Sequence, residues 1–204
     1  VWAKSSIEFN ELYQQILERW RSVIKEEYLH EVISYSYLDR AYILKQKQTE
    51  RAEFIMGGNE PVNHDTTDLQ ILKILSKDCR TPLIDIAKQL KMDSASIIYR
   101  IRQLEKKGII LGYKADINLK SLNRYFYTVK LYLSDFKRKI QLLTYLRTLS
   151  IVTNFTVSIG SWDVEFDAEV ESDDEYHSLI ADLKDRFDFI SEVQFFRAPK
   201  TFKI

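Results

Sequence analysis

The middle of the chain is predicted to form three short amphipathic helices. The first follows a capping-box pattern at residues 67–70, and its apolar stripe is Leu69, Ile71, Leu72, Ile74 and Leu75. Thr81 and Pro82 supply an N-cap and a first-turn proline for the second helix, whose buried side is Leu83, Ile86, Ala87 and Leu90. After a turn at residues 91–93, Asp93 or Ser94 caps a third helix that runs to Lys107, and Gly108 is its left-handed stop. Two short helices separated by a tight turn predict a helix-turn-helix.

The third helix has two distinct sides. At about 100° per residue, Ile97, Ile101 and Leu104 lie within about 60° of one another, so they are expected to face the core. The opposite side gathers Ala95, Ser96, Tyr99, Arg102, Gln103 and Lys106, with Arg100 on the flank. Small residues in the first turn, Ser94 and Ser96 among them, allow a helix end to approach a groove floor, where its backbone amides bind phosphate.

These outward side chains suit the groove of double-stranded DNA. Tyr99 and Gln103 are expected to reach base edges, and the basic residues Arg100, Arg102 and Lys106 to reach bases or phosphates. Further phosphate contacts are expected from Lys88, Lys106, Lys107 and Lys114. The alternative is an ordinary solvated polar face, which most amphipathic helices have. Residues 109–117 are predicted to form two short strands around Gly112, a wing that completes a winged helix-turn-helix.

Residues 125–202 alternate between strand and helix patterns. The predicted order is a strand at 125–133, a helix at 140–149, strands at 151–159 and 162–170, a helix capped at 172–175 and a strand at 193–202. This βαββαβ order is that of a ferredoxin-like unit. In the third strand, acidic residues 163, 165, 167 and 169 alternate with apolar ones, so one face is charged. The sheet face away from the helices is expected to bury against a second copy or, along the acidic row, to be solvated.

The N-terminal segment repeats the end of the C-terminal one at an offset of 167 positions. Ser5, Glu8, Phe9, Leu12, Ile16, Arg19, Trp20 and Val23 match Ser172, Glu175, Tyr176, Leu179, Leu183, Arg186, Phe187 and Ile190. A strand is predicted at 30–44, and residues 45–56 are expected to continue as a connecting helix. Residues 1–44 are therefore interpreted as the last helix and strand of a second ferredoxin-like unit, in a fragment of a longer tandem protein. Chance similarity between two amphipathic helices is the alternative.

Charge divides the chain in the same places. Residues 1–65 carry 8 basic and 11 acidic side chains, residues 66–120 carry 11 and 6, and residues 121–204 carry 11 and 13. The basic middle segment indicates a polyanionic partner, although a surface that simply happens to be lysine-rich is the alternative. We expect an α+β chain with a helix-strand element at 1–56, a linker at 57–65, a winged helix-turn-helix at 66–121 and a ferredoxin-like domain at 122–204.

Several functional classes find no support in the sequence. No stretch approaches the roughly 18 apolar residues that span a bilayer, and no signal peptide is visible, which indicates a cytoplasmic protein without a membrane partner. The single cysteine, Cys79, excludes an internal disulfide and a multi-thiolate metal site. No metal-ligand spacing, phosphate loop or nucleophile elbow is present, so no cofactor, metal or catalytic residue is expected.

The chain resembles the Lrp/AsnC family of transcription regulators. The similarity lies in residues 68–72, in Ile86-Ala87, in residues 99–110 with Gly112-Tyr113, and in the hairpin at 160–163. The resemblance implies sequence-specific DNA binding by a dimer or higher homo-oligomer, with the C-terminal unit serving assembly and the sensing of an amino acid or related metabolite. The family's effector position corresponds to Gly160 and Asp163. The N-terminal extension departs from single-unit members and is expected to occupy a surface that they use for self-association.

Two other functions compete with regulation. Some haem-biosynthesis decarboxylases resemble the same two-part architecture, and an enzyme of that kind would need clustered histidine or arginine. The three histidines, His30, His64 and His177, are scattered over a strand, the linker and a helix. An architectural DNA-binding protein is the third interpretation, and it would bind without regard to sequence.

Overall fold

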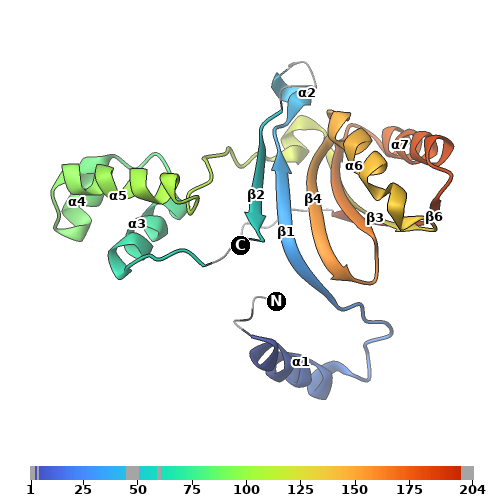
Figure 1. Cartoon of the computed structure of the whole chain (residues 1–204), viewed down its shortest axis with the longest axis horizontal. Coiled ribbons are helices and arrows are strands. Elements are labelled where there is room, and N and C mark those ends of the chain that lie inside the picture. Colours follow the sequence, from blue (N-terminus) through green and yellow to red (C-terminus); the bar gives the residue numbers. More distant parts are fainter. Residues whose placement is uncertain (1–2, 4, 45–50, 59–60, 199–204) are drawn as a thin grey trace.

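The chain folds into a three-helix domain and a larger sheet domain, each with its own hydrophobic core (Figure 1). The computed structural model describes residues 3, 5–44, 51–58 and 61–198. The helices are α1 (Ser6–Trp20), α2 (Ala41–Leu44), α3 (Thr66–Lys77), α4 (Leu83–Leu90), α5 (Ser94–Lys106), α6 (Lys139–Thr148) and α7 (Asp173–Arg186), with 3-10 turns η2 (Leu119–Leu122) and η3 (Phe136–Arg138). The strands are β1 (His30–Leu38), β2 (Glu53–Gly57), β3 (Tyr125–Leu133), β4 (Val152–Gly160), β5 (Val164–Val170) and β6 (Ile190–Ala198).

The three-helix domain confirms the predicted helix-turn-helix. Its buried core includes Ile71 from α3, Ile86 from α4, and Ile97 and Leu104 from α5, as the apolar spacing predicts. The prediction is wrong for Leu69 and Leu83, which lie at the first turns of α3 and α4 and are exposed. Ile101 is partly buried against this cluster. Since these side chains interlock all three helices, the outward side of α5 is fixed by the same packing.

Two of the predicted helix starts are wrong by a few residues. α3 is capped by Asp65, which accepts a hydrogen bond from the Asp68 amide at 2.8 Å while Asp68 accepts one from the Asp65 amide at 3.2 Å. This capping box lies two residues before the predicted one. Thr81 does not cap α4, because its hydroxyl donates to the Asp78 carbonyl at 2.7 Å. The cap of α5 by Asp93 and the left-handed Gly108, with φ +68°, are confirmed.

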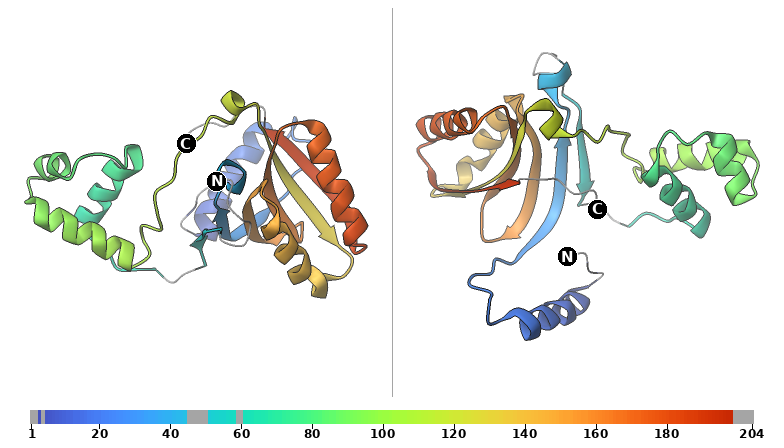
Figure 2. Two further views of the ribbon diagram at one scale, coloured as in Figure 1. Left: turned by 90° about the horizontal axis from the view of Figure 1, so that it is seen from above. Right: turned by 180° about the vertical axis from the view of Figure 1, so that it is seen from behind.

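The predicted wing strands are absent from residues 109–117. The amides of Ile109 and Ile110 both donate to the Leu104 carbonyl, which folds this stretch back on the end of α5. The segment that follows crosses to the sheet domain, where a Cβ on Gly112 would lie only 2.8 Å from the Phe54 ring. A chain held against the sheet in this way serves as a connector and has no partner strand with which to form a hairpin (Figure 2).

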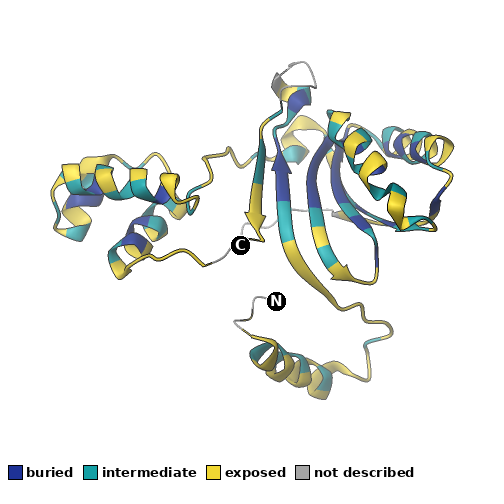
Figure 3. Cartoon of the chain, in the orientation of Figure 1, coloured by how far each residue is buried: buried dark blue, intermediate teal, exposed yellow. Residues whose placement is uncertain are grey.

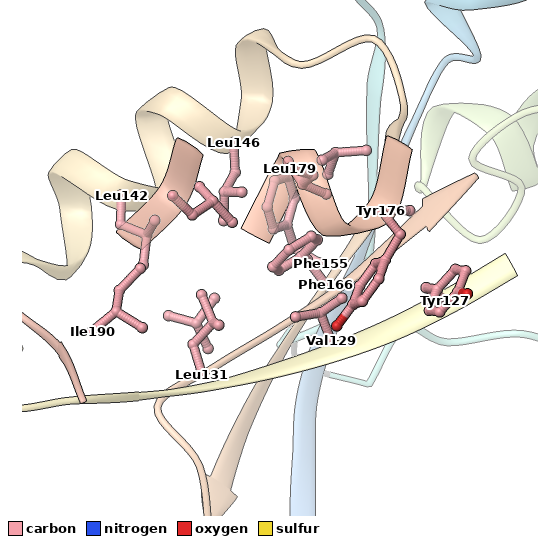
Figure 4. Packing of buried hydrophobic residues seen from close by; sticks show 14 of the residues in the cluster. Tyr127, Val129, Leu131, Leu142, Leu146, Phe155, Phe166, Tyr176, Leu179 and Ile190 are labelled. Carbon is pink, nitrogen blue, oxygen red and sulfur yellow. The ribbon is translucent and has the colours of Figure 1, made fainter. Parts of the chain in front are cut away.

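The sheet domain confirms the βαββαβ order. Its strands lie in the order β2-β1-β4-β5-β3-β6, and all neighbours are antiparallel. Helices α6 and α7 cover one face, and their buried leucines meet apolar side chains from β3, β4 and β5 (Figures 3 and 4). The last strand begins at Ile190, three residues earlier than predicted, and its predicted end at 199–202 lies outside the described residues.

The N-terminal strands extend this sheet. β1 pairs with the β4 edge from His30↔Gly160 to Tyr37↔Asn154, and β2 pairs with β1. The predicted strand at 30–44 is too long, because it ends at Leu38 and α2 follows. The connecting helix predicted at 45–56 is wrong for residues 53–56, which form β2, while residues 45–50 lie outside the described part.

The acidic row of β5 is not the solvated exterior that the sequence allowed. Asp167 and Glu169 are 8% and 1% exposed. Asp167 accepts hydrogen bonds from Thr128, Asn154 and Tyr35. Glu169 pairs with Arg40 through a bidentate contact at 2.9 Å and accepts from Tyr42. Residues 35–42 therefore cover this part of the face and supply the polar partners that a buried carboxylate requires.

Candidate nucleic-acid interface

One side of α5 presents polar side chains to solvent. Ala95, Tyr99, Arg102 and Lys106 follow one another at helical spacing and are all exposed, Tyr99 by 65%. Within the described residues, the side chains of Arg102, Gln103 and Lys106 form no hydrogen bond or ion pair with the rest of the chain. The outward side predicted from the sequence is therefore not packed into the protein, and it can meet a partner.

The first turn of α5 is more closed than predicted. The Asp93 carboxylate accepts from the Ser96 hydroxyl at 2.6 Å and from the Ser96 amide at 2.8 Å. These two bonds, the hydroxyl first, hold the pKa of Asp93 below its usual range, so the carboxylate stays charged at the helix N-terminus. Ser96 is thus engaged in the cap, while Ser94 is partly buried beside it. A phosphate would find the Ser96 amide already occupied.

Arg100 faces the core side of the domain and not the outward side. Its guanidinium lies 2.7 Å from Asp65 and 2.8 Å from Asp68, at the N-terminus of α3. The hydrogen bonds that the guanidinium donates to Asp65 and Asp68 raise the pKa of Arg100. The contact ties α5 to α3, so Arg100 has partners within the domain, and its contact with DNA stays a prediction.

Two of the predicted phosphate contacts also have partners in the chain. Lys107 donates to the Asn63 carbonyl at 3.0 Å and so fastens the linker to the end of α5, although it remains exposed. The Lys114 ammonium lies 3.9 Å from the centre of the Tyr37 ring in the sheet domain. Burial there, and next the charge of Arg40, lowers the pKa of Lys114. The expectation that Lys114 belongs to a DNA-binding wing is corrected accordingly.

The turn between α4 and α5 carries a basic residue that the sequence pattern did not single out. Lys91 is exposed and adopts a left-handed conformation with φ +53°. Lys88, which was predicted, is exposed on α4 one turn earlier. The only sequence signal for Lys91 is its position in the tight turn between the two helices. This signal becomes informative once the structure locates the turn.

The hairpin predicted to hold an effector is built into the sheet. The Asp163 carboxylate accepts from the Leu133 amide at 2.7 Å and so closes the end of β3. Gly160, with φ +153°, pairs with His30, and a Cβ there would lie 2.6 Å from the His30 Cβ. The N-terminal strand β1 thus pairs along this edge of the hairpin.

The three histidines lie on separate elements of the structure. His30 lies on β1, His64 in the linker and His177 on α7. No group of three or more His, Cys, Asp or Glu side chains in the described ranges is arranged to hold a metal ion. Cys79 is exposed. Among the described helices, none combines the length and apolar character needed to cross a bilayer.

Known proteins match the helix-turn-helix in sequence. A winged helix-turn-helix DNA-binding family matches residues 64–110. The transcriptional regulator LrpA of Pyrococcus horikoshii is 46% identical over 65 residues, which is 32% of this chain and 46% of that protein. The regulatory protein AsnC of Haemophilus influenzae is 37% identical over 60 residues, 29% of this chain and 40% of that protein. Each match spans less than half of the relative's length.

Solved structures match a larger part of the chain by fold. AsnC of E. coli has a TM-score of 0.63 at 21% identity, covering 70% of this chain and 97% of that one. A transcriptional regulator of Neisseria meningitidis, solved as an L-Met complex, has a TM-score of 0.63 at 18% identity, covering 70% and 94%. The chain is therefore similar to Lrp/AsnC transcription regulators in the sequence of its helix-turn-helix, and it shares their two-domain fold over the larger part of its length.

Proposed function

We propose that the chain is a sequence-specific DNA-binding transcription regulator, and that α5 is its recognition helix. The observation that carries this proposal is the outward stripe of Tyr99, Arg102 and Lys106, which is exposed and has no partner among the described residues. In a helix-turn-helix the second helix of the pair lies in the major groove, where side chains of this length and polarity reach base edges. The names of the sequence relatives support the same role.

We propose separate roles for the polar residues of this domain. Arg102 and Gln103 would contact base edges, while the exposed lysines Lys88, Lys91 and Lys106 would contact phosphates. Arg100, Lys107 and Lys114 act within the chain, where they hold α5 to α3, to the linker and to the sheet domain. Phosphate contacts would make the affinity fall with salt, and base contacts would make it depend on sequence.

A second copy is part of the proposal. Two helix-turn-helix domains that are held together by their sheet domains would read two half-sites about one helical turn apart. Phe196 on β6 is 62% exposed on the sheet face away from the helices, beside the part that Arg40 and Tyr35 already cover. That remaining apolar surface supports the proposal of a homodimer.

Selection from a random duplex pool tests this function. We expect the full chain to enrich one approximately palindromic sequence, with binding that weakens steeply as salt rises. Enrichment of no sequence, with tight binding to every competitor, would favour an architectural protein. An absence of binding at low salt would exclude both DNA-binding functions. A tetrapyrrole retained on purification would favour the decarboxylase alternative.

We also propose that binding of an amino acid regulates the chain. The support is the shared fold with the Neisseria meningitidis regulator, which was solved as an L-Met complex. Calorimetry with a panel of amino acids tests it, and Asp163→Asn is the matched variant because its amide oxygen still accepts from the Leu133 amide. If the hairpin binds the ammonium group, the variant loses affinity while its stability is kept. Equal binding would place the ligand elsewhere, and no heat with any amino acid would exclude this regulation.

A further inference from the structure

The N-terminal helix α1 has the apolar face of a helix that packs on a sheet. Phe9, Leu12, Tyr13, Ile16 and Trp20 follow one another at positions i, i+3, i+4, i+7 and i+11, so they lie on one side of the helix. None of the 15 residues of α1 is buried, and Trp20 is 50% exposed. An isolated helix of this length is marginal in water, so this face needs a partner.

Helix α7 shows what kind of partner this face fits. The five apolar positions correspond to Tyr176, Leu179, Ile180, Leu183 and Phe187 of α7, all of which are packed in the sheet domain's core. Both helices begin with a serine in nearly the same conformation, Ser5 at φ −155° and Ser172 at φ −151°, and each serine accepts from the amide three residues later. The equivalent face in α7 packs on the covered side of a ferredoxin-like sheet. The matching face of α1 is therefore suited to a sheet surface of that kind.

The sheet of this chain leaves such a surface uncovered. Six strands are present, and the core under α6 and α7 is built from β3, β4, β5 and β6, with Leu38 at the end of β1 as the only described side chain of β1 or β2 that joins it. On the same side, Val157 and Ile159 of β4 continue the alternation that begins at the buried Phe155. Ile55 of β2 lies on this side too, since it pairs with Ser36, which pairs with Phe155.

The remaining surface of β2 and of the end of β4 carries exposed apolar side chains. Its apolar border is Val157 and Ile159 on β4, Ile55 on β2, and Ile140 on α6. Ile140 lies on the same side of α6 as Arg147, seven residues later, and Arg147 pairs with Glu53 of β2. Ile140 and Ile159 are 74% and 67% exposed. Between these borders, the small residues Ser34 and Gly57 pair across β1 and β2. We call this surface the β1–β2 trough.

The arm that carries α1 holds it away from its own trough. Residues 21–29 leave α1 beyond the end of the sheet at which β1 begins (Figure 1). Arg21 pairs with Glu27 at 3.3 Å, and the amides of Val23 and Ile24 bond the Trp20 carbonyl, so the arm is bonded to the end of its helix. A helix presented outwards on such an arm is placed to reach another copy.

We propose that α1 of one copy packs into the β1–β2 trough of a second copy, so that two chains exchange their N-terminal helices. The exchange is mutual, and it therefore closes a two-fold symmetric pair. The exchange uses the side of the sheet on which α6 and α7 also pack. It is therefore independent of DNA binding and of a dimer formed through the opposite face of the sheet.

Cysteine cross-linking tests the exchange directly. In a Cys79→Ser background, one tagged chain carries Ile16→Cys on α1 and a second, differently tagged chain carries Ile55→Cys in the trough. The two chains are co-expressed and oxidised. We expect a disulfide-linked pair that contains both tags, and we expect Leu12→Asp, added to the first chain, to reduce its yield at least tenfold. Gln14→Cys, on the opposite side of α1, is the matched control and should give no cross-link.

The outcomes separate the occupants of the trough. Both tags in one cross-linked band support the exchange. A chain that carries both cysteines and forms only an internal disulfide would show that α1 folds back on its own trough, and this would overturn the proposal. The absence of any Ile16→Cys to Ile55→Cys disulfide, in chains whose circular dichroism matches that of the unmodified protein, would overturn it as well.

Discussion

The two domains treat their polar side chains in opposite ways. On α5 of the three-helix domain, Arg102 and Lys106 extend into solvent and have no bonded partner in the described chain. In the sheet domain, Asp167 and Glu169 are buried and bonded by side chains from β1, β3 and β4 and from the segment after β1. The first set is available to a partner molecule, whereas the second holds the N-terminal segment onto the sheet.

Similarity to known proteins follows the same division. Sequence identity reaches 46% in the helix-turn-helix match, whereas the structures that share the larger part of the fold are about 20% identical. Under the proposed function, a surface that must match DNA constrains residue types, while a core accepts many apolar combinations of similar volume. Variants in the two domains should therefore fail in different assays.

The largest effect is expected from Arg40→Ala. Removing this guanidinium leaves Glu169, 1% exposed, without its bidentate partner, and such a loss costs about 3–5 kcal/mol. Urea unfolding of the full chain measures it. The matched control is Arg197→Ala, which breaks an exposed pair with Asp173 and should cost less than about 1 kcal/mol. Equal losses in the two variants would show that the buried pair does not anchor the N-terminal segment.

The next effect depends on pH. Burial is the main cause that raises the pKa of Asp167 to about 6, and hydrogen bonds from Thr128 and Asn154 oppose it. The unfolded chain ionises first, so this group makes stability fall as pH rises from about 4 to about 6. Asp167→Asn cannot titrate, so we expect the fall in the free energy of unfolding between these pH values to be smaller by about 2–3 kcal/mol in this variant. Denaturation at each pH measures the difference. An unchanged pH profile would contradict a buried, protonated Asp167.

Arg102→Ala should leave stability within about 0.5 kcal/mol and weaken specific DNA binding by about 1–3 kcal/mol. The reason is that the side chain is exposed and supports nothing within the domain. Fluorescence anisotropy with the selected duplex measures the binding. Arg19→Ala on α1 changes the net charge equally and is the control. Equal losses of affinity for both variants would mean that DNA binding depends only on the overall charge of the chain.

The smallest effect concerns salt. Lys106→Ala should reduce the slope of log affinity against log salt by about 1, because one phosphate contact is lost. Lys114→Ala should leave the slope unchanged, since Lys114 lies over the Tyr37 ring in the sheet domain. Binding titrations of both variants over a range of salt concentrations check these two predictions. A reduced slope for Lys114→Ala and an unchanged slope for Lys106→Ala would mean that Lys114, and not Lys106, contacts phosphate.

The sequence predicted those parts of the fold that depend on local periodicity. The three helices, the core at Ile97 and Leu104, and the βαββαβ order all follow from apolar spacing and caps, and the structure confirms them. The predicted wing is wrong because Gly112 packs against Phe54, more than 50 residues away in the chain. A contact of that kind leaves no local pattern.

The candidate site shows the same limit. Helical geometry identified the exposed side of α5, but it gave no sign that Arg100 pairs with Asp65 and Asp68, since that requires the position of α3. The acidic row of β5 was visible as an alternation. Its burial by Arg40 and Tyr35 depends on β1 joining the sheet at β4, which no spacing along the chain predicts.

Photo-cross-linking at Tyr99 tests most directly whether the outward side of α5 lies against a DNA duplex. The tyrosine is replaced by p-benzoylphenylalanine in the full chain, and the same replacement at Tyr125 on β3 serves as the comparison. We expect irradiation with duplex DNA at low salt to cross-link the protein through position 99 and not through position 125. Cross-linking through position 125 alone, or through neither position in a sample that binds the duplex, would contradict the assignment of α5 as the recognition helix.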